Sequence, residues 1–274
     1  MAKDHYIELV GKIVVLIELL RDAPAGLTLQ EIAARSGYVK SSVHRILHSL
    51  KKHGYVEQET VGEPYRLGMQ FLTLARGLND GISLLHVARP YLRELGAMFN
   101  ESAYLAVLHA NRGIFVDVHE STRDFRLVGP LGAEVHYHAT AAGKVVAAFL
   151  PSTHRAELLD GRKLERLTEK TFTRRTQLEQ ELAEVRRLGY ATNDEETIVG
   201  AIFLAAPVFD TQQSVCGSIS VGIPKPRYTP LLGKQIIVQL KDSCQRLSSA
   251  LATAMYVHEN RHRVLSAAAG NLLG

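Results

Sequence analysis

The sequence has few cysteines, no long apolar run and little net charge, and each shortage argues against a class of protein. Cys216 and Cys244 are the only cysteines in 274 residues, and neither lies in a Cys-x-x-Cys or Cys/His ligand spacing. A disulfide framework and a cysteine-bound zinc ion are therefore not indicated. The apolar stretch IVVLIELL is broken by Glu18, follows acidic residues, and is far shorter than the roughly 20 residues that span a bilayer. We expect a cytoplasmic protein that is neither exported nor membrane-bound.

The net charge of +4 is too small for a generally polycationic surface, but the positive charge is concentrated in one segment. Between Arg35 and His53 the chain has five Lys or Arg, three His and no acidic residue. Such a segment favours nucleic acid as a partner, through local contacts. The length suits two domains, and no motif indicates a cofactor.

Residues 27–67 predict a module that reads DNA. Thr28 and Glu31 form a capping-box pattern for a short helix through Ala34, and Gly37 suits a tight turn before a second helix that begins near Lys40. The second helix has one apolar stripe, which consists of Val43, Ile46, Leu47 and Leu50. Strands at 55–58 and 65–67, with Gly62 in the turn between them, complete a wing.

The polar side of the second helix carries the cations and short donors that a helix needs in a DNA major groove. Arg66 on the wing is expected to contact the DNA backbone or the minor groove. An ordinary helical hairpin with a solvated basic face is the alternative. The ordered succession of capped helix, turn, basic helix and hairpin favours a winged helix-turn-helix. The predicted DNA-binding residues are Thr28, Lys40, Ser41, Ser42, His44, Arg45, His48 and Arg66.

The rest of the chain predicts an α+β protein. An amphipathic helix is expected over 5–21, and an apolar helical linker over 68–79 is expected to end at a break at Asp80-Gly81. Further helices are predicted at 84–99, from near Thr140, at 177–188 and at 232–258. Strands are predicted around a turn at 111–113, at 126–128, and on both sides of a turn at 210–213. The predicted domains are 1–67, a linker helix 68–81, a larger domain 82–260, and a tail 261–274 whose last residues are expected to be mobile.

Thr140 precedes a helix whose first turn is Ala141, Ala142, Gly143 and Lys144. This start offers unpaired backbone N–H groups, the positive end of the helix dipole and a nearby cation, all of which suit a carboxylate ligand. A capped helix in which Gly143 serves only packing is an equally good interpretation.

Four other patterns carry weaker predictions. Ser218 and Ser220 share one face of a predicted strand, as a pocket lining or as space-filling residues beside a helix. The segment SISVG resembles a nucleophile elbow, but no helix begins at Ser220. As alternate residues of a strand, His136 and His138 would face the same way and could chelate a metal, but two ligands alone do not make a site. The acidic loop 190–197 is most simply a solvated turn.

Five segments in order, KSSVHRILHSLKKHGYV, YRLG, HATAAGKVVAAFLP, RRLGYATNDEE and GAIFLAAPVFD, resemble the IclR family of bacterial transcription regulators over about residues 5–258. The resemblance implies an N-terminal winged helix-turn-helix, a linker helix, and a C-terminal GAF-like effector-binding domain with an antiparallel sheet flanked by helices. It also implies a homodimer or homotetramer that binds a palindromic double-stranded DNA operator. Members respond to small-molecule effectors, often organic acids or aromatic compounds, and most are repressors.

Carried over by motif, the effector pocket includes Thr140, Ala141, Ala142, Gly143, the loop position Asn193, Phe203, Ser220 and Gly222. Ser218 is a further candidate, because strand alternation places it on the same face as Ser220. Family members that bind short keto acids resemble one another in having Asp, Cys and Ser at the positions of Asn193, Phe203 and Gly222. The residues here predict a less charged and more aromatic pocket, and a larger or aromatic-bearing ligand rather than glyoxylate or pyruvate. AEVHYH also departs from the family's proline-leucine pair at the pocket entrance.

We therefore expect a ligand-responsive regulator, more often a repressor in this family, that controls a metabolic operon and senses a small organic or aromatic carboxylate. An enzyme with serine-based hydrolytic chemistry at Ser220 is the rival hypothesis, but no Ser/His/Asp set stands in a recognisable motif.

Overall fold

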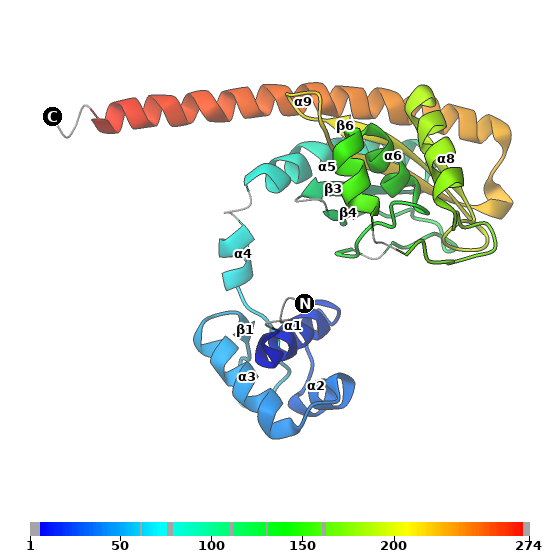
Figure 1. The fold of residues 1–274 in the computed structure, drawn as a ribbon. Coiled ribbons are helices and arrows are strands. Elements are labelled where there is room, and N and C mark those ends of the chain that lie inside the picture. The colour runs from blue at the N-terminus through cyan, green and yellow to red at the C-terminus, as the bar shows by residue number, and fades with distance from the viewer. Residues whose placement is uncertain are drawn as a thin grey trace. The chain divides into compact units, whose positions relative to one another are not determined.

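The computed structural model describes residues 6–60, 62–75, 79–109, 112–129, 131–160 and 163–270, with residues 75, 79–83 and 255–270 described by their backbone alone. These residues divide into two compact units, Met1–Asn79 and Asp80–Gly274 (Figure 1). No helix in the described part of the chain is both long and apolar enough to span a bilayer.

Among the described residues, the first unit contains the helices α1 (Glu8–Arg21), α2 (Leu29–Ser36), α3 (Lys40–Lys52) and α4 (Gln70–Ala75), with a two-stranded wing formed by β1 (Val56–Glu57) and β2 (Arg66–Leu67). The predicted capping box of α2 is confirmed, because Oγ1 of Thr28 accepts the N–H of Glu31 at 3.3 Å and the Glu31 carboxylate accepts the N–H of Thr28 at 2.8 Å. Gly37 has a φ of 70° at the turn into α3, as a left-handed C-cap requires. The buried core of this unit includes Leu16, Ile32, Val43 and Leu47.

Only part of the predicted linker helix, residues 70–75, is observed as a helix before α5 begins. α4 (Gln70–Ala75) is followed, after residues that the structure does not describe, by α5 (Asn79–Phe99). The predicted break at Asp80-Gly81 is wrong, because both residues lie inside α5. One glycine inside a helix costs only about 1 kcal/mol, so Gly81 does not end it.

The second unit is built on a five-stranded antiparallel sheet with the order β4-β3-β7-β6-β5. Its strands are β3 (Ser102–His109), β4 (Arg112–His119), β5 (Ala191–Asp194), β6 (Ala201–Phe209) and β7 (Val215–Pro224). One face packs on α5 and α9 (Pro230–Gly270), and the other on α6 (Ala141–Phe149), α7 (Ser152–Leu159) and α8 (Arg175–Leu188) (Figure 1). A short 3₁₀ turn, Lys225–Arg227, joins β7 to α9.

Strand alternation gives the two faces of β7 different characters. Ile219 and Val221 belong to the apolar core under α5 and α9, whereas Ser218 and Ser220 point to the α6 side. The prediction that the two serines share one face is confirmed. The sheet therefore keeps one face for packing and leaves polar groups on the other.

Several sequence predictions for this unit need correction. Residues 126–128 form no strand, because the Leu127 carbonyl accepts the hydroxyls of Ser102 at 2.7 Å and Tyr104 at 2.6 Å instead of pairing in the sheet. Asn193 lies in β5, not in a loop. In the turn predicted at 111–113, Arg112 and Gly113 already belong to β4, and residue 111 lies outside the described residues.

At the C-terminal end, α9 continues to Gly270 instead of ending near residue 258. The expected mobility of the last residues concerns 271–274, which lie outside the described residues. Helix α7 was not predicted, because its eight residues have no marked apolar stripe.

The outer edge of the sheet is only half covered. β5 pairs only with Ile202–Ala205, so the residues of β6 after Ala205 have no strand beside them on that side in the described chain. Within this stretch Pro207 has no N–H group, and the N–H of Phe209 donates to Oγ of Ser248 on α9 at 2.9 Å.

Candidate functional site

The outward face of α3 is basic and accessible. Lys40, Ser41, His44, Arg45 and His48 are exposed, and Ser42 is half-buried. The apolar stripe faces the core as predicted, with Val43, Ile46 and Leu47 buried and Leu50 packed against them. The rings of His44 and His48 stack with their centroids 6.4 Å apart. The helix thus presents cations and short polar groups together on its solvent side.

Two other predicted DNA-binding residues already have partners within the protein. The hydroxyl of Thr28 belongs to the capping box of α2. Arg66 donates from Nε to the carbonyl of Ala25 at 3.1 Å and from Nη1 to the carboxylate of Glu59 at 3.3 Å. Arg66 therefore braces the wing against the turn before α2.

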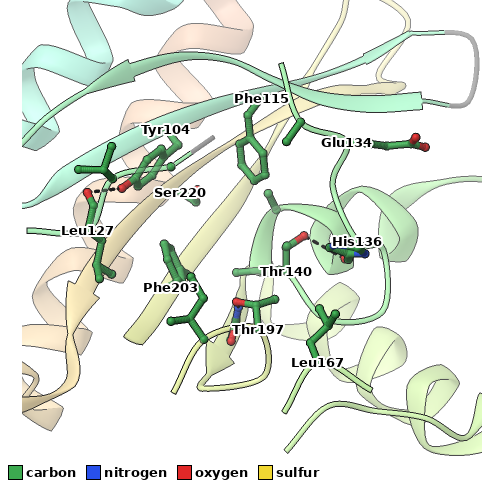
Figure 2. A pocket seen from close by; sticks show the side chains of 17 residues that line it. Tyr104, Phe115, Leu127, Glu134, His136, Thr140, Leu167, Thr197, Phe203 and Ser220 are labelled. Atoms are coloured by element: carbon green, nitrogen blue, oxygen red, sulfur yellow. Dashed lines mark hydrogen bonds between the residues drawn. The ribbon is translucent and has the colours of Figure 1, made fainter. Parts of the chain in front are cut away.

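A cavity of about 330 Å³ lies on the α6 side of the sheet (Figure 2). Three rings from three strands form its apolar wall: Phe115 of β4, Tyr104 of β3 and Phe203 of β6. The Tyr104 ring lies 6.4 Å from that of Phe115 and 6.1 Å from that of Phe203, between centroids. Burial raises the pKa of Tyr104 to about 12, so its hydroxyl stays protonated and donates to Leu127.

The start of α6 forms a second wall. Thr140 caps the helix, because its Oγ1 accepts the N–H of Gly143 at 3.0 Å and donates to the carbonyl of His136 at 3.0 Å. Ala141 and Ala142 line the cavity, whereas Gly143 does not. A Cβ on Gly143 would lie 2.5 Å from the carbonyl oxygen of His136, so this glycine allows the 136–140 segment to pack closely against α6.

Besides Thr140, the predicted polar residues that line the cavity are Asn193 and Ser220, and they differ in their hydrogen bonds. Oδ1 of Asn193 accepts the N–H of Glu196 at 2.8 Å, and Nδ2 donates to the hydroxyl of Thr197 at 2.7 Å. Asn193 therefore shapes the wall. Ser220 is 3% exposed, and its hydroxyl makes no hydrogen bond within the described residues. Its hydroxyl is therefore a polar group of the cavity wall without a hydrogen-bond partner in the described chain.

Two further predicted residues lie beside the cavity and do not line it. Ser218 is fully buried, and its hydroxyl donates to the carbonyl of Ala142 at 3.5 Å. Gly222 is the register partner of Phe203 on the neighbouring strand. Both small residues leave room for the groups that form the wall.

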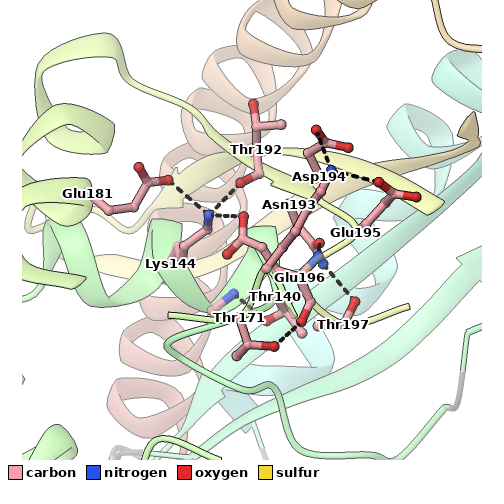
Figure 3. A network of polar contacts seen from close by, with 12 residues as sticks. Thr140, Lys144, Thr171, Glu181, Thr192, Asn193, Asp194, Glu195, Glu196 and Thr197 are labelled. Carbon is pink, nitrogen blue, oxygen red and sulfur yellow. Dashed lines mark hydrogen bonds and ion pairs between the residues drawn. The ribbon is translucent and has the colours of Figure 1, made fainter. Parts of the chain in front are cut away.

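Lys144 is not the cation beside the ligand that the sequence suggested. Its side chain is fully buried, and its ammonium donates to Glu181 at 2.9 Å, to Glu196 at 2.7 Å and to the carbonyl of Thr192 at 2.5 Å (Figure 3). All three N–H groups are used. The helix start loses its neighbouring positive charge to this ion cluster.

The acidic segment at 194–196 is not a solvated turn. Asp194 and Glu195 pair with Lys170 and Lys225, and hydrogen bonds from these lysines lower the pKa of Glu195 to about 2. Burial, only partly offset by Lys144, raises the pKa of Glu196 to about 7. Its Oε2 has no partner among the described residues.

The arrangement does not resemble a hydrolase or a metal centre. Ser220 lies within β7, and no described histidine is hydrogen-bonded to it. The 135–138 segment is not a strand, so the premise that His136 and His138 occupy alternate strand positions is wrong. Nε2 of His138 lies 2.9 Å from the carbonyl oxygen of Glu165. No group of three or more metal-ligating side chains occurs in the described chain.

The sequence predicted six of the cavity-lining residues, and the fold adds the others. Thr140, Ala141, Ala142, Asn193, Phe203 and Ser220 line it as expected. The alternation of β3 could have pointed to Tyr104, because it shares a face with Ser220 across the β3–β7 pair. The residues that were not predicted are Tyr104, Phe115, Leu127, Val128, Gly129, Ala133, Glu134, His136, Leu167, Thr197 and Ile198.

Comparison with known proteins agrees with this architecture. Residues 10–60 match the family model described as IclR helix-turn-helix domain, and residues 78–249 match the one described as Bacterial transcriptional regulator IclR C-terminal. The glycerol operon regulatory protein of Streptomyces griseus is 34% identical over 88% of this chain and 95% of its own length. The transcriptional repressor IclR of Escherichia coli K12 is 30% identical over 78% and 79%.

Among solved structures, an IclR homolog from Microbacterium hydrocarbonoxydans, complexed with 4-hydroxybenzoate, has the same fold. Its TM-score is 0.74 at 22% identity, over 89% of this chain and 98% of the homolog. The relatives are transcription regulators and not enzymes. The chain therefore belongs to the IclR family of bacterial transcription regulators and is a ligand-responsive, DNA-binding regulator.

Proposed function

We propose that the exposed face of α3 reads a double-stranded operator in the major groove. Lys40 and Arg45 would contact phosphates and base edges, and Ser41, Ser42, His44 and His48 would supply hydrogen bonds. A single short helix gives limited specificity, which supports a homodimer or homotetramer on a palindromic site. Thr28 would act by holding α2, and Arg66 by bracing the wing, because both are already bonded.

The same proposal assigns 1–67 to DNA reading, 68–81 to the linker and 82–260 to effector binding, in the cytoplasm. An effector changes operator affinity only if it binds two arrangements of the protein with different affinities. The Escherichia coli relative is a repressor, which supports repression of a metabolic operon here.

We propose a small aromatic carboxylate as the effector. Three rings form the apolar wall, and no Lys or Arg lines the cavity in the described residues. The start of α6 is then the anion-holding group, because the N–H groups of Ala141 and Ala142 have no intrahelical acceptor and lie at the positive end of the helix dipole, whereas that of Gly143 is donated to Thr140. The Microbacterium homolog, complexed with 4-hydroxybenzoate, supports this class of ligand.

The observation that carries the regulatory assignment is the exposed, acid-free face of α3. Its test is binding of the purified protein to DNA upstream of its own gene, measured by fluorescence anisotropy at several salt concentrations. Arg45→Ala should weaken binding and flatten the salt dependence. Arg35→Ala, which removes the same charge from the exposed end of α2, is the matched control. Equal binding by both variants and wild type would refute groove reading by α3.

A further inference from the structure

A groove of about 660 Å³ lies at the half-covered edge of the sheet, beside the part of β6 that β5 leaves unpaired. Its walls come from the end of α8, from the turn between β6 and β7, and from the middle of α9. In the described chain, no residue lines both this groove and the cavity at the start of α6. The volume lies within the roughly 300–1,000 Å³ of sites that bind small molecules. The groove is therefore a separate space that can hold a small molecule.

The floor of the groove is apolar, and its main chain has few free donors. The rings of Phe149 of α6 and Phe209 of β6 meet edge to face, with their centroids 5.4 Å apart. Beside them are Pro207, which has no N–H group, and Leu188, which is half-buried. The N–H of Phe209 is donated to Ser248. A strand of another protein therefore cannot form a regular ladder here, whereas a hydrocarbon body is stabilised by covering the rings.

The rim of the groove is basic. Among the described residues that line it, three cations stand against one acidic residue: Arg186, Arg187, Lys241 and Asp210. The Asp210 carboxylate is engaged in its own turn, because its Oδ1 accepts the N–H groups of Gln212 at 2.8 Å and Ser214 at 2.9 Å. The charge that complements this rim is therefore that of an anion.

Arg186 is the cation of the rim that is free to bind a ligand. It is exposed, and it makes no hydrogen bond or ion pair with any described residue. By contrast, Arg187 donates to the carboxylate of Glu184 at 2.8 Å, and Lys241 donates to the carbonyl of Leu188 at 2.9 Å. A guanidinium presents a fork of donors that matches the two oxygens of a carboxylate. Arg186 thus places a carboxylate-binding group at one end of an apolar floor.

We propose that this groove is a second ligand site, which binds an amphipathic carboxylate with an elongated hydrocarbon body, that is, a medium-chain fatty acid. The carboxylate pairs with Arg186, and the hydrocarbon body lies along Phe149 and Phe209. These two rings belong to the last residues of α6 and β6, whereas Ala141 and Phe203, near the starts of the same elements, line the cavity. The same helix and strand border both sites, so a ligand in the groove has a means to act on the cavity.

The experiment is a calorimetric titration of the full-length protein with decanoate as the probe. Wild type should bind one decanoate per chain, and Arg186→Ala should bind it roughly tenfold more weakly, because a charge-assisted hydrogen bond is lost. Arg93→Ala is the matched control and should bind decanoate as wild type does. Arg93 of α5 is also exposed and unpaired among the described residues, but it does not line the groove. Decylamine, which has the same chain and the opposite charge, should not bind.

Ser249→Trp tests the position of the hydrocarbon body. Ser249 is exposed on α9 and lines the groove, so an indole at this position fills the space without removing a buried group. The variant should lose decanoate binding and keep the melting temperature of wild type and its operator binding without ligand. Retained decanoate binding by a folded Ser249→Trp protein would contradict the proposed location.

Four other results would each overturn the proposal. They are absence of decanoate binding by wild type, equal binding by Arg186→Ala and Arg93→Ala, binding of decylamine as tight as that of decanoate, and displacement of decanoate by 4-hydroxybenzoate. Sedimentation velocity on Ser249→Trp provides one more check. A change in the number of subunits would show that the groove packs against a second copy of the chain and not against a fatty acid.

Discussion

Lys144→Met should destabilise the second unit strongly, and more at high pH than at low pH. The substitution removes the ammonium that three acceptors surround and leaves Glu196 and Glu181 without their shared cation. Breaking a buried ion pair by removing one partner costs about 3–5 kcal/mol. Glu181 is 26% exposed and can recover hydration, so most of this cost comes from Glu196. In a unit of this size, that corresponds to a fall of roughly 6–20 °C in melting temperature.

The pH dependence follows from the direction of the Glu196 shift. Its pKa is raised from 4.5 to about 7 in the folded protein, so the folded state holds more protons than the unfolded state between these values. The stability that this group contributes is present below the unfolded pKa and is lost as pH rises through the folded pKa. Without Lys144 the folded pKa rises further, and the penalty of the variant grows from pH 5.5 to pH 8.

Thermal unfolding followed by circular dichroism at pH 5.5 and pH 8 measures both effects. Lys170→Met is the matched control, because Lys170 also pairs with acidic residues of this segment but is 48% exposed. Its loss should cost about 1 kcal/mol or less. The reasoning is refuted if the melting temperatures of Lys144→Met and Lys170→Met lie within 2 °C of each other, because a difference of that size corresponds to no more than about 1 kcal/mol.

Three further predictions concern single side chains. Wild type should lose stability between about pH 5 and pH 7, and Glu196→Gln should abolish this loss. Glu195→Gln should instead shift the stability curve evenly over this range, since the pKa of Glu195 is about 2, and parallel curves for both variants would contradict this. Thr28→Ala should lower the stability of the first unit by about 1 kcal/mol and speed amide exchange in α2, and unchanged exchange would exclude an energetic role for the capping box. Ser220→Ala should keep operator binding but weaken 4-hydroxybenzoate binding roughly fivefold, and identical calorimetric titrations would show that the hydroxyl does not meet the ligand.

Local rules predicted the parts of this protein that depend on neighbours in the chain. The capping box at Thr28, the left-handed turn at Gly37 and the cap at Thr140 are each set within four residues, and all three are observed. The alternation that places Ser218 and Ser220 on one face is likewise a property of a single strand. These local features were sufficient to locate α3 and one wall of the cavity.

What could not be predicted depends on contacts between distant segments. The acidic run after Tyr190 has the composition of a solvated turn, yet β5 forms there. Glu196 is buried and paired with Lys144, which lies 52 positions earlier in the chain. The same contact withdraws Lys144 from the ligand that it was expected to hold. Phe203 lies directly beside Gly222 only because the β6–β7 register pairs the two residues.

The half-covered edge of the sheet bears on how the protein behaves at high concentration. An open strand edge recruits strands from other molecules through its free N–H groups, and this is a common route to aggregation. Pro207 has no such group, and the N–H of Phe209 is already donated to Ser248. On this stretch of β6, two N–H groups that an incoming strand would need as donors are therefore not available. The short β5 therefore leaves an edge that is open in space but poor as a template for amyloid-like growth.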